Sequence, residues 1–477
     1  MPASDDEEVS ADEEWNDTRS TRRRRLECIL LNMCGIMWQA DNGLMATVYF
    51  EISKEFGVGP SDLGRLTLVR GVTEAIFSLP AGFMAEVKPR PLLIFIGILL
   101  WSAGIIGCGV VTTFDGLILC RMVNGAGLGL VQPLLLSLVS DTNAPSRRGT
   151  AFGLLQFTGN LGTMGGGYLS TILAPTLIMG MLGWRFVFIV FGMLSALVGI
   201  ALVSFIGEPR KQAFNETSLL SIIRAKAPEM LAIMRIPTFL LIIGQGVAGT
   251  APWFAFSYLS IWLELGCFSH SETAGINSFF VLGQAAAGLL GGKLLDVVAS
   301  RYPDHGPAWL CQFSVGIGLP LFAFIFFGLK DNTSGTMMVP FCATFALAGS
   351  LVAWCGIANN KIFGDIVPQS VYTYVFSLDR AVEGAFGALG TPAVGLVTER
   401  VFSFDQSAVT SGACSPKDAA SLGSGIFWVC TVCWSACFLF YCGLHYTYPR
   451  DRIRSQKQQV MLESSDSEDE SSQSAGD

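Results

Sequence analysis

Twelve apolar runs of about 20 residues or more divide this chain of 477 residues, and each could cross a lipid bilayer as a helix. Hydrophobic residues make up 51% of the chain and charged residues 14%, whereas globular proteins have about 25% charged residues. The sequence therefore predicts an all-α polytopic membrane protein with twelve transmembrane helices. The runs are 27–50, 62–86, 91–112, 114–139, 149–174, 182–207, 237–263, 273–298, 307–329, 336–363, 372–397 and 421–447.

The longest internal polar break, residues 208–236, divides the runs into six and six. We therefore expect a six-helix bundle at 27–207 and a second six-helix bundle at 237–447, joined by a cytoplasmic central loop. The flanking segments 1–26 and 448–477 contain dense acidic and serine stretches and are expected to be disordered tails.

Basic residues predict the orientation in the membrane. Of the 30 Lys and Arg residues, nineteen lie in the termini and in the loops on their side of the membrane, whereas four lie in the opposite loops. Because cytoplasmic loops are enriched in Lys and Arg, both termini and the central loop are expected to be cytoplasmic.

The two halves repeat one pattern at an offset of 210 residues: a serine followed by an acid, a glycine 21 residues after the serine, and a second acid four residues later. Internal repeats of this kind are typical of transporter folds whose substrate site lies between the halves. The copies are Ser61, Asp62, Gly82 and Glu86 in the first half, and Ser271, Glu272, Gly292 and Asp296 in the second.

Several motifs resemble the major facilitator superfamily over about residues 27–447. GFMAE at 82–86 with Arg90 is similar to the family's motif between helices 2 and 3, and RMVNGAGLG at 121–129 is similar to its fourth-helix motif. SDLGRLTLVRG, NNKIFGDIVP and SLDRAVEGAFG resemble a plant, algal and protist branch distantly similar to Spinster transporters. The resemblance implies two pseudo-symmetric six-helix bundles and transport by alternating access, with helices 1, 4, 7 and 10 lining the cavity.

Among the charged residues of the first-half runs, we single out four that lie at middle to outer depth in the membrane: Asp41, Arg70, Glu74 and Arg121. Charges in hydrocarbon cost roughly 3 kcal/mol each on insertion scales, so they mark functional sites or internal ion pairs. Asp41 is expected to face Arg121, and these four residues are candidates for proton or ion coupling. The alternative is a fixed structural network.

A second polar group lies in the second half, at Asn359, Asn360, Asp379, Arg380 and Glu383. The spacing of the last three places them on about half of one helix surface. We expect them to form a gate at the cytoplasmic side, in which charges pair across the two halves. Direct substrate binding by Asn359, Asn360 or Arg380, and simple helix anchoring, are the alternatives.

Glycines in two runs are expected to allow close helix packing, and Pro392 is expected to add a kink. These glycines are Gly159, Gly162, Gly165 and Gly166, and Gly384, Gly387 and Gly390. Gln245, Trp253 and Tyr258 in the run 237–263 are candidate cavity residues, with Pro252 breaking that helix, and Gln284 in the run 273–298 is a fourth candidate; core or lipid packing is the alternative for the aromatic residues. An aromatic, mildly polar cavity favours an organic or amphipathic solute.

Cysteine and histidine patterns give no metal site and no catalytic set. Cys267 and Cys414 fall in loops on one side of the membrane, so either a disulfide or two free thiols is compatible with the sequence. The three histidines lie in loops or at helix ends, and none is near an acidic cluster in the sequence pattern. No cofactor and no enzymatic activity are expected.

The sequence thus favours a secondary transporter for a small organic or amphipathic solute, with protons as the expected coupling ion. The alternatives are an uncoupled facilitator and a transporter-like receptor or scaffold. We expect a monomer in the lipid bilayer, without nucleic acid as a partner, in the plasma membrane or a vacuolar or lysosomal membrane.

Overall fold

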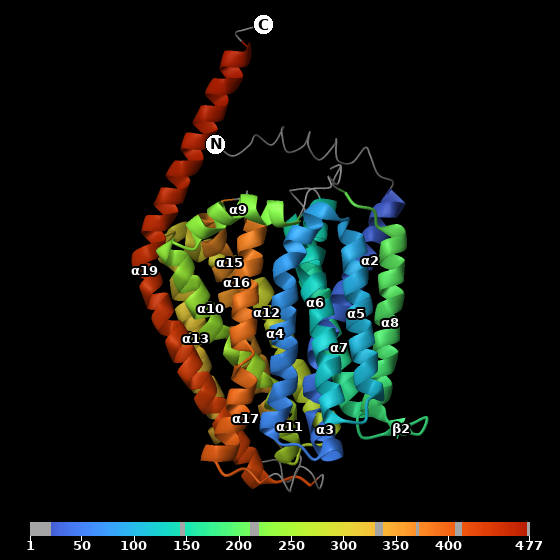
Figure 1. The fold of residues 1–477 in the computed structure, drawn as a ribbon. Helices are drawn as coiled ribbons and strands as arrows, with labels where there is room; N and C mark the ends of the chain where they lie inside the picture. The colour runs from blue at the N-terminus through green and yellow to red at the C-terminus, as the bar shows by residue number, and fades with distance from the viewer. Residues whose placement is uncertain are drawn as a thin grey trace.

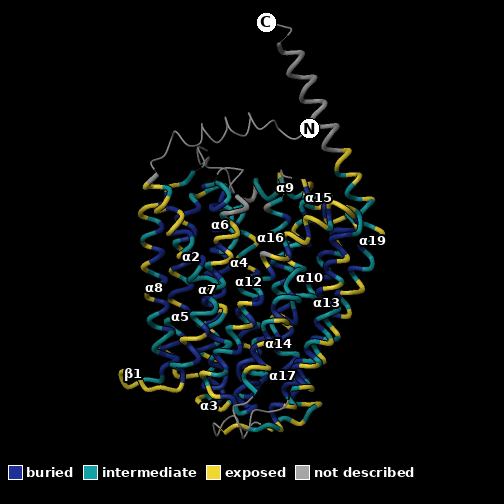
Figure 2. Tube along the Cα trace, turned by 180° about the vertical axis from the view of Figure 1, so that it is seen from behind, coloured by how far each residue is buried: buried dark blue, intermediate teal, exposed yellow. Residues whose placement is uncertain are grey.

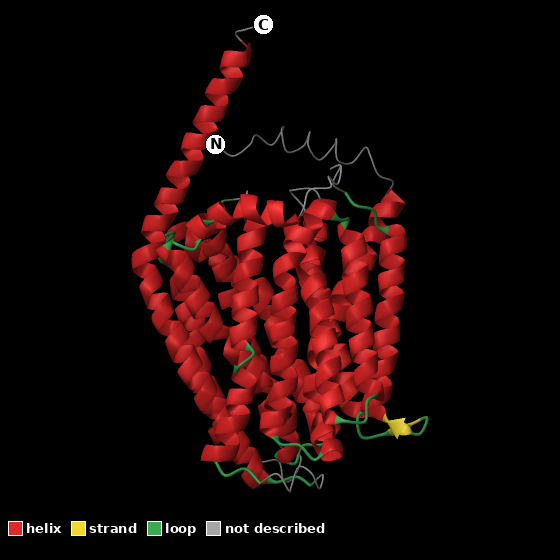
Figure 3. Ribbon diagram, in the orientation of Figure 1, coloured by secondary structure: helices red, strands yellow, loops and turns green. Residues whose placement is uncertain are grey.

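The computed structural model describes residues 21–143, 148–209, 219–329, 337–368, 372–405 and 413–474. Long helices stand side by side, and the start of α2 and the end of α19 lie at the same end of the molecule (Figure 1). We call this the terminal end and the opposite end the distal end. Among the described residues, the only strands form a small hairpin at the distal end (Figure 3).

The first bundle is built from six membrane-length helices and the short α3. Their bounds are α2 (Thr21–Thr47), α3 (Tyr49–Phe56), α4 (Pro60–Val87), α5 (Arg90–Val110), α6 (Phe114–Thr142), α7 (Arg148–Leu173) and α8 (Gly183–Phe205). Between α7 and α8, β1 (Leu177–Ile178) pairs antiparallel with β2 (Met181–Leu182). Met179 and Gly180 at the hairpin turn both have positive φ, which favours glycine at the second position.

The second bundle follows α9 (Leu219–Ile233) and contains interrupted helices. Its elements are α10 (Pro237–Ala255), η2 (Phe256–Tyr258), α11 (Leu259–Leu265), α12 (His270–Arg301), α13 (Gly306–Ala323), η3 (Phe324–Gly328), α14 (Met338–Val352), α15 (Cys355–Ile366), α16 (Tyr372–Gly387), α17 (Gly390–Val401) and α19 (Pro416–Ser474). Each expected membrane run thus corresponds to one helix or to one interrupted helix.

Nine helical stretches of the described residues are long and apolar enough to cross a membrane. The other three long helices of the first bundle, α2, α4 and α7, have similar lengths but lack an equally apolar stretch. Together with the fold, this describes an all-α polytopic membrane protein of two six-helix bundles. Large apolar side chains such as Leu197, Val297 and Leu439 are exposed, as lipid contact requires. Figure 2 shows exposed positions along the outer helices α8 and α19.

Several predicted boundaries differ from the structure. The helix at Pro252 does not break there: α10 continues to Ala255, and the interruption is the 3₁₀ turn η2. The interruption near Pro392 lies between Gly387 and Gly390. A proline lacks the N–H of a helical bond and its ring crowds the carbonyl four residues earlier, so α17 accommodates Pro392 in its first turn.

The ends of the chain are more helical than expected. The helix α2 begins at Thr21, inside the segment 1–26, and α19 extends past residue 447. Contacts explain the latter, because Asp451 accepts hydrogen bonds from the N–H and hydroxyl of Thr238 at the start of α10 (3.1 and 2.6 Å). The acidic stretch at 5–14, like the rest of residues 1–20, lies outside the described residues.

Two seams join the bundles. The helix α4 packs along α16 and α17, and α7 packs along α12. Because α4 and α12 occupy equivalent places in the two halves, as α7 and the α16–α17 pair do, the seams are related by the internal repeat. Polar residues on these helices and on the neighbouring α2, α6 and α10 therefore define the candidate site.

Candidate functional site

A buried polar network in the first bundle is centred on Asp41 of α2. The Asp41 side chain is completely buried. The Asn124 side chain of α6 donates a hydrogen bond to Asp41 Oδ1 (3.1 Å), and Arg121 donates to Asn124 Oδ1 (3.0 Å). Asp41 and Arg121 were expected to face each other, and Asn124 links the two through its side-chain amide. Asn124 was not among the residues singled out from the sequence.

Arg70 of α4 completes this network. Its Nη2 lies 3.8 Å from Asp41 Oδ2 and 3.3 Å from Glu74 Oε2, and it donates to Asn42 Oδ1 at 2.5 Å. Asp41 Oδ2 itself has no hydrogen-bond partner. Two carboxylates thus share one guanidinium group, an arrangement in which a proton on either carboxylate changes the pairing of the other.

Glycines set the distance between α4 and α6. A Cβ atom at Gly125 would lie 2.4 Å from the carbonyl oxygen of Arg70, and a Cβ atom at Gly129 would lie 2.3 Å from that of Glu74. Any larger residue would separate the helices. The glycines of the 121–129 motif therefore bring Arg70 and Glu74 close to the polar residues of α6.

The charged residues of the second half lie on α16. Arg380 Nη2 is 3.2 Å from Asp379 Oδ2 and 3.0 Å from Glu383 Oε2. Both carboxylates are buried, whereas the Arg380 side chain is 38% exposed. In this conformation these ion pairs lie within one helix and do not join the two halves.

Glu383 also packs against the backbone of α10. A Cβ atom built at Gly246 would lie only 1.6 Å from Glu383 Oε1. Glu383 Oε1 and Asp379 Oδ1 are buried without a hydrogen-bond partner. Gly246 therefore provides the space that the Glu383 carboxylate occupies.

Asn359 and Asn360 have different environments. Asn359 is buried, and its Oδ1 lies 3.0 Å from the hydroxyl of Tyr441, which also lies 2.7 Å from Gln245 Oε1. Asn360 is exposed. Gln245 thus belongs to a buried contact between α10, α15 and α19, together with Asn359.

A cavity of about 130 Å³ lies between the bundles toward the distal end. Its lining comes from α2, α7, η2, α11 and α12 and includes Thr47, Thr163, Phe256, Ser260 and Asn277. It is largely apolar, with hydroxyl and amide groups at its wall. The four candidate cavity residues are not part of this lining.

Those four residues have other surroundings. Tyr258 is fully buried and donates a hydrogen bond to the Pro60 carbonyl oxygen, across the two halves. Trp253 is partly exposed, and its ring contacts Phe256 and Phe280. Gln284 is half-buried.

At the terminal end, the repeated motif makes a contact between the halves in its first copy. The Tyr374 hydroxyl of α16 donates to Glu86 Oε1 (2.8 Å), and the Tyr374 ring stacks on Phe83, next to Gly82. Buried Arg90 binds Asp141 (2.7 Å) and Glu208, at the ends of α6 and α8. In the second copy, Asp296 is exposed and Gly292 faces open space.

At the distal end, further contacts join the halves. Glu399 of α17 accepts hydrogen bonds from Ser61 of α4. His270 lies between two buried acids, Glu264 and Glu51. The sequence pattern placed no histidine near an acidic cluster, but the folded chain brings Glu51 of the first half to His270 of the second, because residues distant in sequence meet when the halves pack.

The packing glycines have three kinds of surroundings. Gly162, Gly166, Gly387 and Gly390 each face a neighbouring helix, where an added Cβ atom would lie 2.3 to 3.0 Å from other atoms. Gly159 lies against Gln39. Gly165 and Gly384 have no neighbour within 4 Å of an added Cβ atom, so close packing does not explain them.

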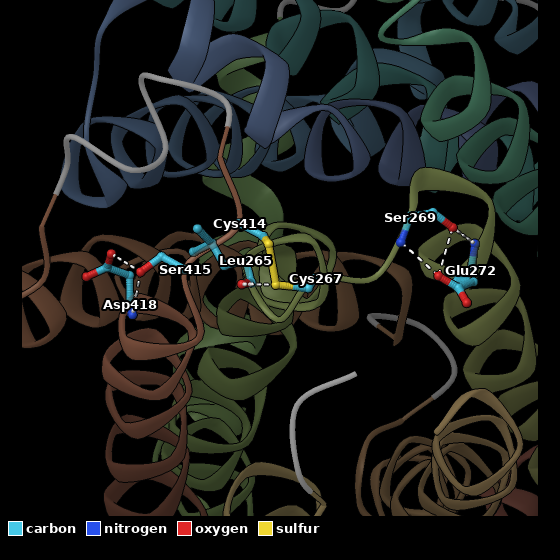
Figure 4. The surroundings of a disulfide bond; sticks show 7 residues. All are labelled: Leu265, Cys267, Ser269, Glu272, Cys414, Ser415 and Asp418. Atoms are coloured by element: carbon cyan, nitrogen blue, oxygen red, sulfur yellow. Dashed lines mark hydrogen bonds between the residues drawn. A yellow bond between two sulfur atoms is a disulfide. The ribbon is translucent and has the colours of Figure 1, made fainter. Parts of the chain in front are cut away.

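The structure forms the Cys267–Cys414 disulfide, with the Cα atoms 5.1 Å apart (Figure 4). The bond ties the loop after α11 to the segment before α19. The N–H of Ser415 donates to the Leu265 carbonyl oxygen (2.9 Å), which adds a second link between the same segments.

Comparisons with known proteins match this architecture. The family model described as Major Facilitator Superfamily matches residues 31–391. Protein spinster of Drosophila melanogaster is 22% identical over 372 residues, which cover 76% of this chain and 60% of that protein. The probable L-galactonate transporter of Escherichia coli (strain K12) is 26% identical over 185 residues, 38% of this chain and 40% of that protein. The matched segments thus span less than two thirds of either relative.

A solved structure shares the fold over most of the chain. It is a bacterial homolog to the human lysosomal transporter Spinster, in an inward-facing and unoccupied conformation. Its TM-score is 0.73 at 17% identity, and the match covers 91% of this chain and 99% of that chain. At this identity the likeness shows the fold alone.

Proposed function

The chain belongs to the Major Facilitator Superfamily, and we propose that it is a secondary transporter that moves a small organic or amphipathic solute by proton-coupled alternating access. The buried Asp41–Arg70–Glu74 group is the main support for coupling. One guanidinium group is within 4 Å of two carboxylates from two helices. Protonation of one carboxylate leaves Arg70 to pair with the other, and the side-chain link between α2 and α4 changes with it.

Contacts at both ends support alternating access. The Tyr374–Glu86 contact lies at the terminal end, and the Ser61–Glu399 contact lies at the distal end, both between α4 and the α16–α17 pair. Both contacts are present in this structure, and rocking of one bundle against the other would break one of them while the other remains. Asp41 and Arg70 lie on helices that take part in this movement.

We also propose that both termini face the cytoplasm. The distribution of Lys and Arg favours this orientation. The disulfide adds support, because it lies at the distal end, and disulfides persist on the oxidising, non-cytosolic side of a membrane.

Purified protein in proteoliposomes tests the transport function. Liposomes that enclose a pH-sensitive dye are exposed to panels of aldonic acids, nucleosides and amphipathic organic compounds, with and without an imposed pH gradient. A compound that evokes proton flux and accumulates only with the gradient identifies a coupled substrate class. Absence of solute flux across the panels, despite binding, would support a receptor instead.

The Asp41→Asn variant tests the coupling site with the compound found. It should lose accumulation driven by the pH gradient and retain exchange of the solute, since the amide keeps the shape but not the charge. Asp115→Asn, an exposed acid at the start of α6, is the matched control and should behave as the wild type. Gradient-driven accumulation that survives in Asp41→Asn would exclude this role and favour an uncoupled facilitator or another coupling residue.

A further inference from the structure

Three titratable side chains meet at the distal end, apart from the Asp41 network. Glu51 lies on α3 of the first bundle, whereas Glu264 on α11 and His270 at the start of α12 belong to the second. His270 Nδ1 is 2.8 Å from Glu264 Oε1, and His270 Nε2 is 3.7 Å from Glu51 Oε1. We call these three residues the distal triad.

The two carboxylates are enclosed, but the histidine is accessible. The Glu51 and Glu264 side chains are 7% and 4% exposed, and that of His270 is 31% exposed. Glu264 Oε2 is buried without a hydrogen-bond partner. A proton can therefore reach the imidazole, while the carboxylates lie largely out of contact with water.

Local structure fixes the position of His270. Ser269 caps α12 by accepting the N–H of Glu272, and the Glu272 carboxylate accepts the N–H of Ser269 (Figure 4). The Cys267–Cys414 disulfide holds the loop three residues before His270. The ring is also held from the first bundle by an edge contact with Phe50.

The charges of the distal triad favour a bound proton. A neutral imidazole has one N–H, so one of its nitrogens would direct a lone pair at a carboxylate. An imidazolium has two N–H groups and can face both acids. With a neutral ring, the two enclosed carboxylates would have no positive charge between them. Lys54 on α3 is also near the ring, but its side chain is exposed. Solvent screens such an exposed charge strongly.

We propose that the distal triad is a proton-binding site, and that the bound proton holds the distal ends of the two bundles together. Glu51 belongs to one bundle and His270 to the other, so opening of the distal end separates them. The closed end therefore binds the proton more tightly than the open end. By linkage, proton binding must favour the closed end, so acidification closes it and alkalinisation releases it.

The test measures the width of the distal end at different pH values in the full chain, reconstituted in lipid nanodiscs. Spin labels are attached through non-canonical residues at positions 115 and 417, which are exposed distal-end sites in the first and second bundle. Pulsed electron resonance gives the distance distribution between about pH 5 and pH 8, the range in which imidazoles titrate. In the wild type, the short-distance population should fall several-fold as the pH rises.

Variants separate the proton site from a merely structural contact. His270→Gln keeps a hydrogen-bonding side chain but cannot be protonated, so the distances should no longer depend on pH. Glu264 and His270 belong to the same bundle, so Glu264→Gln weakens proton binding to His270 equally in the open and closed states. The distances should still change with pH, but the midpoint of the change should move to lower pH. Glu51→Gln removes the group that opening separates from His270, so the amplitude of the response should fall. His305→Gln, at the terminal end, is the control and should respond as the wild type.

A wild-type distance distribution that does not change with pH would overturn the proposal, as would a His270→Gln variant with an unchanged response. If His270→Gln does not fold, the contrast between Glu51→Gln and Glu264→Gln decides, because a structural contact would not give a lower amplitude in one variant and a shifted midpoint in the other. The contrast between these variants, measured in the Asp41→Asn background, does not depend on protonation of Asp41 or on the transported solute.

Discussion

Ser61 donates both its backbone N–H and its hydroxyl to the Glu399 carboxylate, at 2.9 and 2.6 Å, although 338 positions separate the two residues. Ser61 lies in the first turn of α4, where backbone N–H groups have no partner within the helix. A carboxylate from the second bundle therefore caps a helix of the first bundle. Gly395 lets the backbones approach closely beside this contact, because a Cβ atom there would lie 2.5 Å from the Cα atom of Ser61.

Replacement of Glu399 by Ala should loosen the distal end. The variant loses two hydrogen bonds to a charged group, and each such bond contributes about 1.5 to 3 kcal/mol. Hydrogen exchange of the first two turns of α4, followed by mass spectrometry, should become at least several-fold faster. Arg400→Ala changes the exposed neighbouring residue and should leave this exchange unchanged; equal protection in both variants would mean that the contact does not hold the two bundles.

Replacement of Asn124 by Leu should destabilise the first bundle. The change leaves Arg121 and Asp41 without their shared hydrogen-bond partner, at a cost of about 1 to 3 kcal/mol. Thermal unfolding of the purified protein measures this loss. Leu119→Ala, on the exposed side of the same helix, should have a smaller effect; an Asn124→Leu variant as stable as the wild type would show that the bridge contributes little.

A methyl group at position 246 should displace the Glu383 carboxylate. Gly246→Ala would place a Cβ atom 1.6 Å from Glu383 Oε1, so either the carboxylate moves or α10 shifts, at about 1 to 3 kcal/mol. Gly384→Ala, one residue beyond Glu383 and facing open space, should be tolerated. Thermal unfolding compares the two, and adding Glu383→Ala should restore much of the stability that Gly246→Ala loses. A double variant no more stable than Gly246→Ala would exclude this contact as the cause.

The disulfide should report the orientation of the distal end. If that end faces away from the cytoplasm, a membrane-impermeant reductant added outside intact cells should release the Cys267 and Cys414 thiols of protein at the cell surface. Alkylation with a mass label and gel electrophoresis detect them. The Cys267→Ser/Cys414→Ser variant controls for the other cysteines. Release only after permeabilisation of cells that carry the protein at their surface would contradict the proposed orientation.

The distribution of apolar residues along the sequence predicted the fold well. Apolar runs fixed the number of helices, because a helix must satisfy its backbone groups within the bilayer whatever lies beside it. The grouping of Asp41, Arg70 and Glu74 was also predictable, since charges within a membrane must face one another or an internal cavity.

Contacts that depend on how the bundles pack were not predictable. Asn124 belongs to a glycine-rich motif and carries no charge, so no local pattern marked it as the bridge to Asp41. Glu51 and His270 lie at helix ends, where polar residues usually face solvent. Their meeting requires α3 and α12 to come together from opposite halves. For the same reason, the sequence could not show whether Arg380 would pair with Asp379 and Glu383 of its own helix or with acids of the other half.

The two bundles differ in continuity, because three membrane-length helices of the second are interrupted along their length, at 256–258, 353–354 and 388–389, whereas the long helices α4 to α8 of the first run unbroken. Stiff rods transmit a tilt along their whole length, but jointed rods can bend one half while the other stays in place. A conformational cycle of this chain would therefore be asymmetric. The first bundle would move as a rigid body, and the second would bend at its helix interruptions.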